Sequence, residues 1–115
     1  MGIQNFSEDI LLVTLPEQPQ RGDELETITQ IVSDQPVYDV VVDFSRVEML
    51  ISESICSLMI LEKLLGGVGH RLILCNVPSE IRGILARVGL EAFFEFTDDE
   101  FQALQFLRRA SSFYG

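Results

Sequence analysis

The sequence predicts an α/β fold built on a mostly parallel sheet, with an N-terminal hairpin and four helices. Residues 38–44 and 71–76 form continuous apolar runs, which are typical of strands buried on both faces of a parallel sheet. Segments with apolar residues at helical spacing alternate with these runs, and such alternation needs crossover connections between parallel strands. We expect an element order of β-β-α-β-α-β-α-β-α in a single domain, residues 1–115.

The opening of the chain predicts the hairpin and the first helix. Residues 3–6 and 10–15 are short apolar stretches separated by Ser-Glu-Asp, which indicates two antiparallel strands joined by a turn. Prolines and a glycine then interrupt the chain. Residues 23–34 repeat apolar side chains at helical spacing, with acids in the first turn, where the helix dipole favours them. We expect the first helix there.

The middle of the chain predicts the central strand, the second helix and a further strand. The valines of residues 38–44 place this strand inside the sheet, between parallel neighbours. Residues 54–65 share an apolar face, so we expect a helix that Gly66 and Gly67 close. Residues 71–76 form the next buried strand.

The last third of the chain predicts two helices around a short strand. A proline in the first turn opens the third helix, which Gly89 ends. We expect a strand at residues 93–96. Thr97 with Glu100 three residues later matches the capping box, and this predicts a last helix that ends near Ala110.

The composition favours a protein partner over nucleic acid. Eight Lys and Arg against 18 Asp and Glu give a formal net charge of −10, while 47% of the residues are hydrophobic. The acids must therefore lie on the surface of a packed core. Such a surface repels a phosphate backbone, and Arg108-Arg109 is the only adjacent basic pair. We expect no nucleic-acid binding and a basic protein partner instead.

The sequence offers little for catalysis or for a cofactor. Cys56 and Cys75 lie in apolar runs without a CxxC motif, and His70 is the single histidine, so we expect neither a metal site nor a bound cofactor. Cys56 and His70 would be the nucleophile and base of an enzyme, and nothing suggests a third, orienting group. We expect two buried core thiols in a reducing cytosol and no enzymatic activity.

The sequence predicts no targeting or membrane-spanning segment. It shows no basic-plus-apolar signal, and its longest apolar stretch, around residues 55–65, contains Ser57, Glu62 and Lys63. This stretch is too short to span a bilayer. We expect a cytoplasmic protein without direct membrane insertion.

Two places in the sequence predict a binding or regulatory site. Asp43 ends the central strand at the carboxyl edge of the sheet, where α/β proteins place their sites, but it would serve equally well as a loop cap. The next segment brings Ser52, Glu53 and Ser54 to a helix N-terminus, whose free N–H groups attract anions and would favour a phosphoserine. The alternative is that Ser52 or Ser54 is only an N-cap and Glu53 only a first-turn acid.

A longer stretch resembles a known family. Residues 40–55, Val-Val-Val-Asp-Phe-Ser-Arg-Val-Glu-Met-Leu-Ile-Ser-Glu-Ser-Ile, are similar to the characteristic segment of the STAS family, which includes the bacterial anti-sigma factor antagonists. The later half adds Arg-Leu-Ile-Leu-Cys-Asn at residues 71–76, a proline-opened helix followed by Val-Gly-Leu, a Phe-rich strand and an acidic-capped last helix. The resemblance covers residues 9–108 and implies the STAS fold, with the element order that the periodicity predicts.

The resemblance also implies a regulatory loop, at which this sequence differs from the family. In the antagonists the loop before the second helix usually reads Asp-Ser-Ser-Gly; a partner anti-sigma kinase phosphorylates the second serine, and the unphosphorylated form binds that partner and frees the sigma factor. Aligned without gaps from Asp43, these positions fall on Ile51, Ser52, Glu53 and Ser54, so Glu53 takes the phosphorylated position. The family's acidic, glycine-containing turn after the second strand is not recognisable in residues 16–20.

We therefore expect a non-catalytic regulator of transcription that binds an anti-sigma factor or serine kinase. Asp43, Ser52, Glu53 and Ser54 would be its partner-binding or regulatory residues, with Ser52 and Ser54 as candidate phosphorylation sites. A bulky residue at Ser54 should weaken partner binding without unfolding the protein. Two alternatives stay open: a STAS scaffold or accessory subunit of a membrane transporter or signalling complex, and, with less support, a small enzyme.

Overall fold

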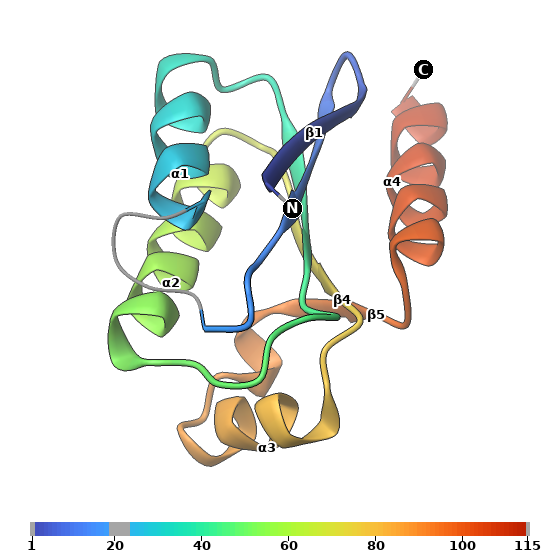
Figure 1. Ribbon diagram of the computed structural model, residues 1–115. Coiled ribbons are helices and arrows are strands. Elements are labelled where there is room, and N and C mark those ends of the chain that lie inside the picture. Colours follow the sequence, from blue (N-terminus) through green and yellow to red (C-terminus); the bar gives the residue numbers. More distant parts are fainter. Residues whose placement is uncertain (1, 19–23, 115) are drawn as a thin grey trace.

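One five-stranded sheet organises the computed structural model, which describes residues 2–18 and 24–114 (Figure 1). The strands lie side by side in sequence order: β1 (Gly2–Ser7), β2 (Ile10–Thr14), β3 (Asp39–Asp43), β4 (Leu72–Cys75) and β5 (Glu95–Thr97). β1 pairs antiparallel with β2, and every later pair is parallel. The predicted hairpin, the central position of β3 and the mostly parallel sheet are confirmed.

Helices cover both faces of this sheet. They are α1 (Glu24–Asp34), α2 (Ser52–Gly67), α3 (Ser79–Arg87) and α4 (Glu100–Tyr114). Figure 1 shows α1 and α2 together on one face and α4 alone on the other. No helix within the described residues is long and apolar enough to cross a bilayer.

The alternation of side chains along each strand builds two cores of different size. Leu11 and Val13 of β2 pack with Val40 and Val42 of β3 in the larger core, which α1, α2 and α3 cover. The intervening strand side chains face α4 and form the smaller core together with residues of that helix. The strands contribute Ile10, Leu12, Val41, Ile73 and Cys75, and α4 contributes Ala103 and Leu107. Both faces of β2, β3 and β4 are therefore buried, which explains why their sequences are continuously apolar.

Several predicted element ends differ from the structure. Gly66 and Gly67 form the last turn of α2, and the chain reverses after them at Gly69, whose φ of 80° suits glycine. Gly89, with φ 78°, follows α3 as predicted. The first helix is described from Glu24 onwards; residues 19–23, which include its predicted first residue and two of the interruptions before it, lie outside the described part of the chain.

The predicted strand at residues 93–96 is shifted. Glu91–Phe93 form a 3-10 turn, and β5 begins only at Glu95, which pairs with Ile73 of β4. Phe94 is the reason, because its side chain is 5% exposed and packs into the larger core at the point where the chain enters the sheet. Three phenylalanines within residues 93–96 indicate burial without showing which residue starts the strand.

The cap of α4 also differs from the prediction. Thr97 belongs to β5, and the carboxylate of Asp99 accepts the backbone N–H of Gln102 at 2.8 Å, while the Gln102 side chain accepts the N–H of Asp98 at 2.8 Å. Asp99 and Gln102 therefore cap the helix, in place of the predicted Thr97 and Glu100. The helix continues to Tyr114, beyond the predicted end, since no proline or glycine interrupts residues 100–114.

Candidate functional site

Three connections leave the sheet at the carboxyl ends of its central strands. Thr14, Asp43 and Cys75 lie next to one another where β2, β3 and β4 end, because these strands are parallel and in register. Backbone bonds extend the pairing beyond the strands: the Leu15 N–H donates to the Asp43 carbonyl at 3.2 Å, and the Phe44 N–H donates to the Cys75 carbonyl at 3.0 Å. The connection from β3 to α2, residues 44–51, therefore starts from a fixed position. We call it the β3–α2 loop.

Asp43 braces the β3–α2 loop from beneath. Its carboxylate accepts the backbone N–H of Ser45 at 2.9 Å and the side-chain amide of Asn76 at 3.1 Å. The residue is only 8% exposed, so its side chain does not form part of the outer surface. Of the two roles that the sequence left open for Asp43, this geometry is that of a loop cap.

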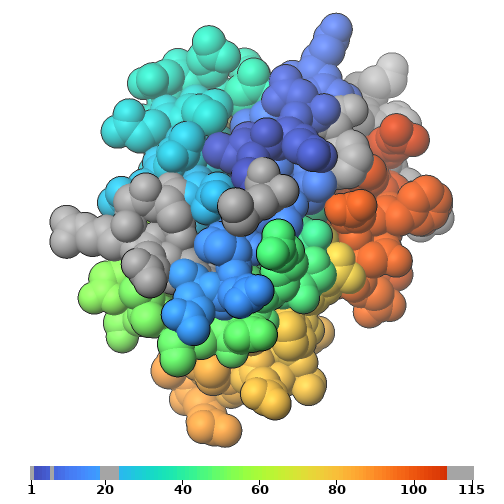
Figure 2. Space-filling view, viewed as in Figure 1, coloured from blue at the N-terminus to red at the C-terminus, as the bar shows by residue number. Residues whose placement is uncertain are grey.

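A second attachment holds the outer part of the β3–α2 loop. The carbonyl of Glu17, in the connection that follows β2, accepts the N–H groups of Glu48 at 2.8 Å and Met49 at 3.4 Å. Figure 2 shows the two segments in contact on the surface, residues 15–18 in blue and the loop in green. Val47 is buried, whereas Glu48 is exposed and Met49 is 49% exposed. An ordered loop thus presents an apolar side chain to solvent.

The first turn of α2 follows directly. Ile51 occupies the N-cap with extended backbone, φ −99° and ψ 164°, and its carbonyl accepts the N–H groups of Ser54 at 3.1 Å and Ile55 at 3.2 Å. Both serines therefore lie inside the helix, and the expectation that Ser52 or Ser54 is the N-cap is wrong. Glu53 is a first-turn acid, as predicted.

Three of the predicted site residues lie in this turn, but they differ in their exposure to solvent. Ser52 and Glu53 are exposed, whereas Ser54 is 2% exposed and faces the core side of α2. A kinase can reach the Ser52 hydroxyl directly, but it can reach Ser54 only if the turn opens. The burial of Ser54 also argues against the expectation that a bulky residue there leaves the fold intact.

A small cavity lies beside this turn, between α1 and α2. Its volume is about 250 Å³, and its lining consists of Glu26, Ser52, Glu53, Cys56 and Ser57. Cys56 is exposed there, so the prediction of two buried thiols is wrong for Cys56 and confirmed for Cys75. Glu26 was not among the predicted site residues, because only the packing of α1 against α2 brings it near residues of the second helix.

The groups considered for catalysis or metal binding do not assemble. Cys56 lies near the start of α2 and His70 beyond its end, which at 1.5 Å per residue places them about 20 Å apart. The His70 Nδ1 lies 3.2 Å from the Asp39 carboxylate instead. Burial, reinforced by Asp43, raises the pKa of Cys75 to about 12, so that thiol stays protonated. Among the described residues, no group of three His, Cys, Asp or Glu could hold a metal ion.

Comparisons with known proteins identify the fold. No family model matches the sequence, and no curated protein is significantly similar to it. The anti-sigma factor antagonist SpoIIAA, in its unphosphorylated form, superimposes with a TM-score of 0.76 at 17% identity, over 92% of this chain and 94% of that chain. A STAS domain protein from Planctomyces limnophilus superimposes with a TM-score of 0.71 at 20% identity, over 91% and 97% of the two chains.

A third match belongs to a much larger protein. The murine anion transporter Slc26a9 superimposes with a TM-score of 0.66 at 15% identity, over 87% of this chain but only 18% of the transporter chain. All three proteins superimpose on most of the sheet and helices of this chain. The chain therefore has the STAS fold, as the sequence resemblance predicted.

Proposed function

We propose that this protein is a cytoplasmic regulator, without catalysis of its own, that binds an anti-sigma factor or serine kinase. The binding surface is the β3–α2 loop together with Ser52 and Glu53. One observation carries the proposal: the loop is tied to Asp43 on one side and to Glu17 on the other, yet exposes Met49. A loop that is already ordered loses little conformational entropy on binding, and an exposed apolar side chain can anchor a partner.

The fold supports a regulatory partner of this kind. SpoIIAA, an anti-sigma factor antagonist, has the same architecture, and its structures include an unphosphorylated form and a phosphorylated form from Bacillus. In this chain Ser52 offers an accessible hydroxyl, and Glu53 supplies a permanent negative charge at the position that the ungapped alignment equates with the phosphorylated serine. Regulation would then act on the first turn of α2.

The charge around the loop supports a basic partner surface. Glu17, Glu48 and Glu53 are all exposed there, and the ion pairs among the described residues join other side chains. Arg46 is the single base of the loop, so the acids there are in excess. Such an excess attracts a positively charged partner over a distance of about 8 Å at physiological salt. Association should therefore slow steeply as salt rises, and a flat salt response would argue against electrostatic recognition.

The test is capture of the partner followed by measurement with the purified protein. The full chain is used as bait in an extract of its source cells, mass spectrometry identifies what it captures, and calorimetry measures the affinity. We expect an anti-sigma factor or serine kinase and a loss of about tenfold or more in affinity for Met49→Asp. Val37→Asp is the matched control, because Val37 is 52% exposed and precedes β3 at the opposite end of the strand. Equal affinity of wild type and Met49→Asp would contradict the proposal.

The match to Slc26a9 favours one second candidate function, that of an accessory subunit of a membrane transporter. In that protein a STAS-like part makes up a small share of the chain. Capture of a transporter from the membrane fraction, with the same loss for Met49→Asp, would favour this function over sigma-factor regulation.

A further inference from the structure

We infer that the groove between α1 and α2 is a docking site for an arginine-bearing amphipathic segment of a partner protein. The inference rests on the proposed function, since it names the chemistry by which the partner would be held. It concerns side chains outside the β3–α2 loop, so the two can be tested separately.

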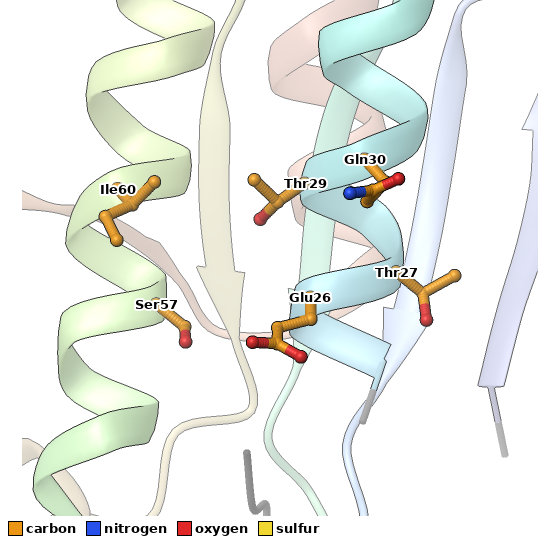
Figure 3. A pocket seen from close by; sticks show the side chains of 6 residues that line it. All are labelled: Glu26, Thr27, Thr29, Gln30, Ser57 and Ile60. Atoms are coloured by element: carbon orange, nitrogen blue, oxygen red, sulfur yellow. The ribbon is translucent and has the colours of Figure 1, made fainter. Parts of the chain in front are cut away.

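The groove consists of two cavities lined by residues of α1 and α2. Its main part has a volume of about 490 Å³ and is lined by Glu26, Thr27, Thr29, Gln30, Ser57 and Ile60. Glu26 and Ser57 also line the smaller cavity at the start of α2, so the two spaces adjoin. Figure 3 shows Glu26 and Thr29 extending from α1 toward α2, where Ser57 and Ile60 lie, while Thr27 points away from α2. We call the joined spaces the α1–α2 groove.

Two hydroxyl groups in the α1–α2 groove can act as hydrogen-bond acceptors for a ligand. Thr29 Oγ1 donates to the carbonyl of Leu25 at 2.8 Å, and Ser57 Oγ donates to the carbonyl of Glu53 at 2.9 Å. A hydroxyl has one hydrogen, so each has used its donor within its own helix and retains lone pairs for a ligand. The carboxylate of Glu26 adds further acceptors between them. A ligand that supplies several donors complements this lining.

The charge and the apolar part of the lining narrow the ligand further. Among the described residues, the charged side chains that line the two cavities are those of Glu26 and Glu53, both acidic, so this lining favours a cation and disfavours phosphate. Ile60 is 58% exposed at one end and offers an apolar contact. Arginine combines five donors in one plane with an aliphatic stem that packs on apolar surface, whereas the lysine ammonium has three donors and is more strongly hydrated.

The groove's position argues for a segment of a protein partner. It opens beside Ser52 and Glu53, which belong to the proposed binding surface, so a partner seated on the β3–α2 loop could continue along α2. The chain's net charge of −10 favours a basic segment over an acidic one. Leucine or isoleucine one helical turn from the arginine would then meet Ile60.

The test uses a synthetic amphipathic peptide with arginine and leucine one helical turn apart, and a second peptide with citrulline in place of arginine. Citrulline keeps the shape of arginine but removes its charge. Binding to the full-length protein is followed by fluorescence anisotropy, and the site is mapped by backbone amide shifts in NMR spectra. We expect shifts in α1 and α2 and affinity at least about fivefold lower for the citrulline peptide. Absence of binding, or equal affinity of the two peptides, would overturn the inference.

Matched variants locate the contact. Glu26→Gln and Ile60→Ser should each weaken the arginine peptide by about fivefold, whereas Glu80→Gln and Val88→Ser, at exposed positions on and after α3, should leave it unchanged. Circular dichroism confirms that each variant is folded. If both groove variants bind like wild type, the groove is not the site. A partner that depends on Met49 but not on Glu26 or Ile60 would likewise refute the groove while leaving the proposed function intact.

Discussion

Each end of β3 has an aspartate that accepts a backbone N–H, but the two aspartates have different consequences. Asp39 at the amino end and Asp43 at the carboxyl end lie on one face of the sheet, four residues apart. Asp39 accepts the backbone N–H of Arg71 at 2.9 Å, and Asp43 accepts the backbone N–H of Ser45 at 2.9 Å. Each carboxylate also contacts one nitrogen-bearing side chain from the β4 side of the sheet. The aspartates thus hold the segments at both ends of the strand.

The surroundings of the two aspartates separate their roles. At the amino end each carboxylate has a side-chain partner, since His70 lies against Asp39 and Arg71 lies 3.6 Å from Glu95. At the carboxyl end the brace supports a loop that exposes Met49 and leads to Glu53. The side chains at the amino end contact one another, whereas the loop at the carboxyl end exposes side chains to solvent. Mutations should therefore separate stability from partner binding.

The largest effect is expected from Asp43→Ala. Loss of a buried carboxylate leaves the Ser45 N–H and the Asn76 amide without their acceptor, so the free energy of unfolding should fall by about 3 kcal/mol and partner affinity should fall with it. Urea unfolding and hydrogen exchange of residues 44–51 measure the two effects. Asp39→Ala should cost about 1 kcal/mol, because Asp39 is more exposed, and should leave partner affinity unchanged. Equal losses of affinity in the two variants would break the comparison.

The asymmetry between the ends of β3 could be predicted only in part. The element order followed from periodicity, because the strands are buried on both faces and most helices bury one face. Asp43 was recognised from its place at the end of a parallel strand. The attachment to Glu17 could not be, since it is a backbone contact between loops distant in sequence. Sequence patterns do not show which backbone carbonyl will accept the N–H groups of a distant loop.

The next largest effect concerns two serines that look alike in the sequence. Ser54→Phe should lower the free energy of unfolding by about 2 kcal/mol, because the side chain would enter a packed core, whereas Ser52→Phe at an exposed position should change it by less than about 0.5 kcal/mol. Ser52→Phe should instead weaken partner binding. Thermal unfolding of both variants measures the difference, and comparable stability of the two would show that Ser54 is not held against the core.

Helical phase explains why these serines and Cys56 were misjudged. α2 buries Ser54, Leu58, Leu61 and Leu65, so its stripe includes a serine and leaves Ile55, the first apolar residue of the predicted face, only partly buried. Cys56 lies off the stripe and faces the cavity beside α1. The α1–α2 groove could not be predicted, because its residues are polar side chains from separate helices. Its shape depends on how closely the helices pack.

Glu53→Ser should have a smaller effect, confined to binding. If Glu53 acts as a fixed partial substitute for phosphoserine, with about one negative charge in place of 1.5 to 2, its removal should raise affinity for an anti-sigma kinase by about fivefold. If a basic residue of the partner contacts Glu53, the same change should weaken binding. Calorimetry on wild type, Glu53→Ser and Glu53→Gln distinguishes the two, and weaker binding by both variants would refute the fixed substitute. The free energy of unfolding should change little, since Glu53 is exposed.

The smallest effect is expected from Glu62, a carboxyl near the amino end of the sheet that has no hydrogen-bond partner within the described part of the chain for one of its oxygens. Glu62 of α2 is partly buried, and burial, reinforced by Glu95, raises the pKa of its carboxyl above the usual 4.5. Its Oε2 is buried without a hydrogen-bond partner among the described residues. A carboxyl with a raised pKa in the folded state favours folding when protonated, and that contribution is lost as pH rises through the folded-state pKa.

Glu62→Gln, which resembles the protonated form, should therefore raise the free energy of unfolding at neutral pH by a few tenths of a kcal/mol, roughly what a partly exposed charge can contribute. The gain should disappear as pH falls below 4.5, where the wild-type carboxyl is itself protonated. Glu80→Gln removes the same charge from an exposed position on α3 and controls for the general repulsion of an acidic protein. Urea unfolding across this pH range gives both differences. An equal gain for Glu80→Gln, or a gain that persists at low pH, would show that Glu95 and burial do not act on Glu62 in the folded protein.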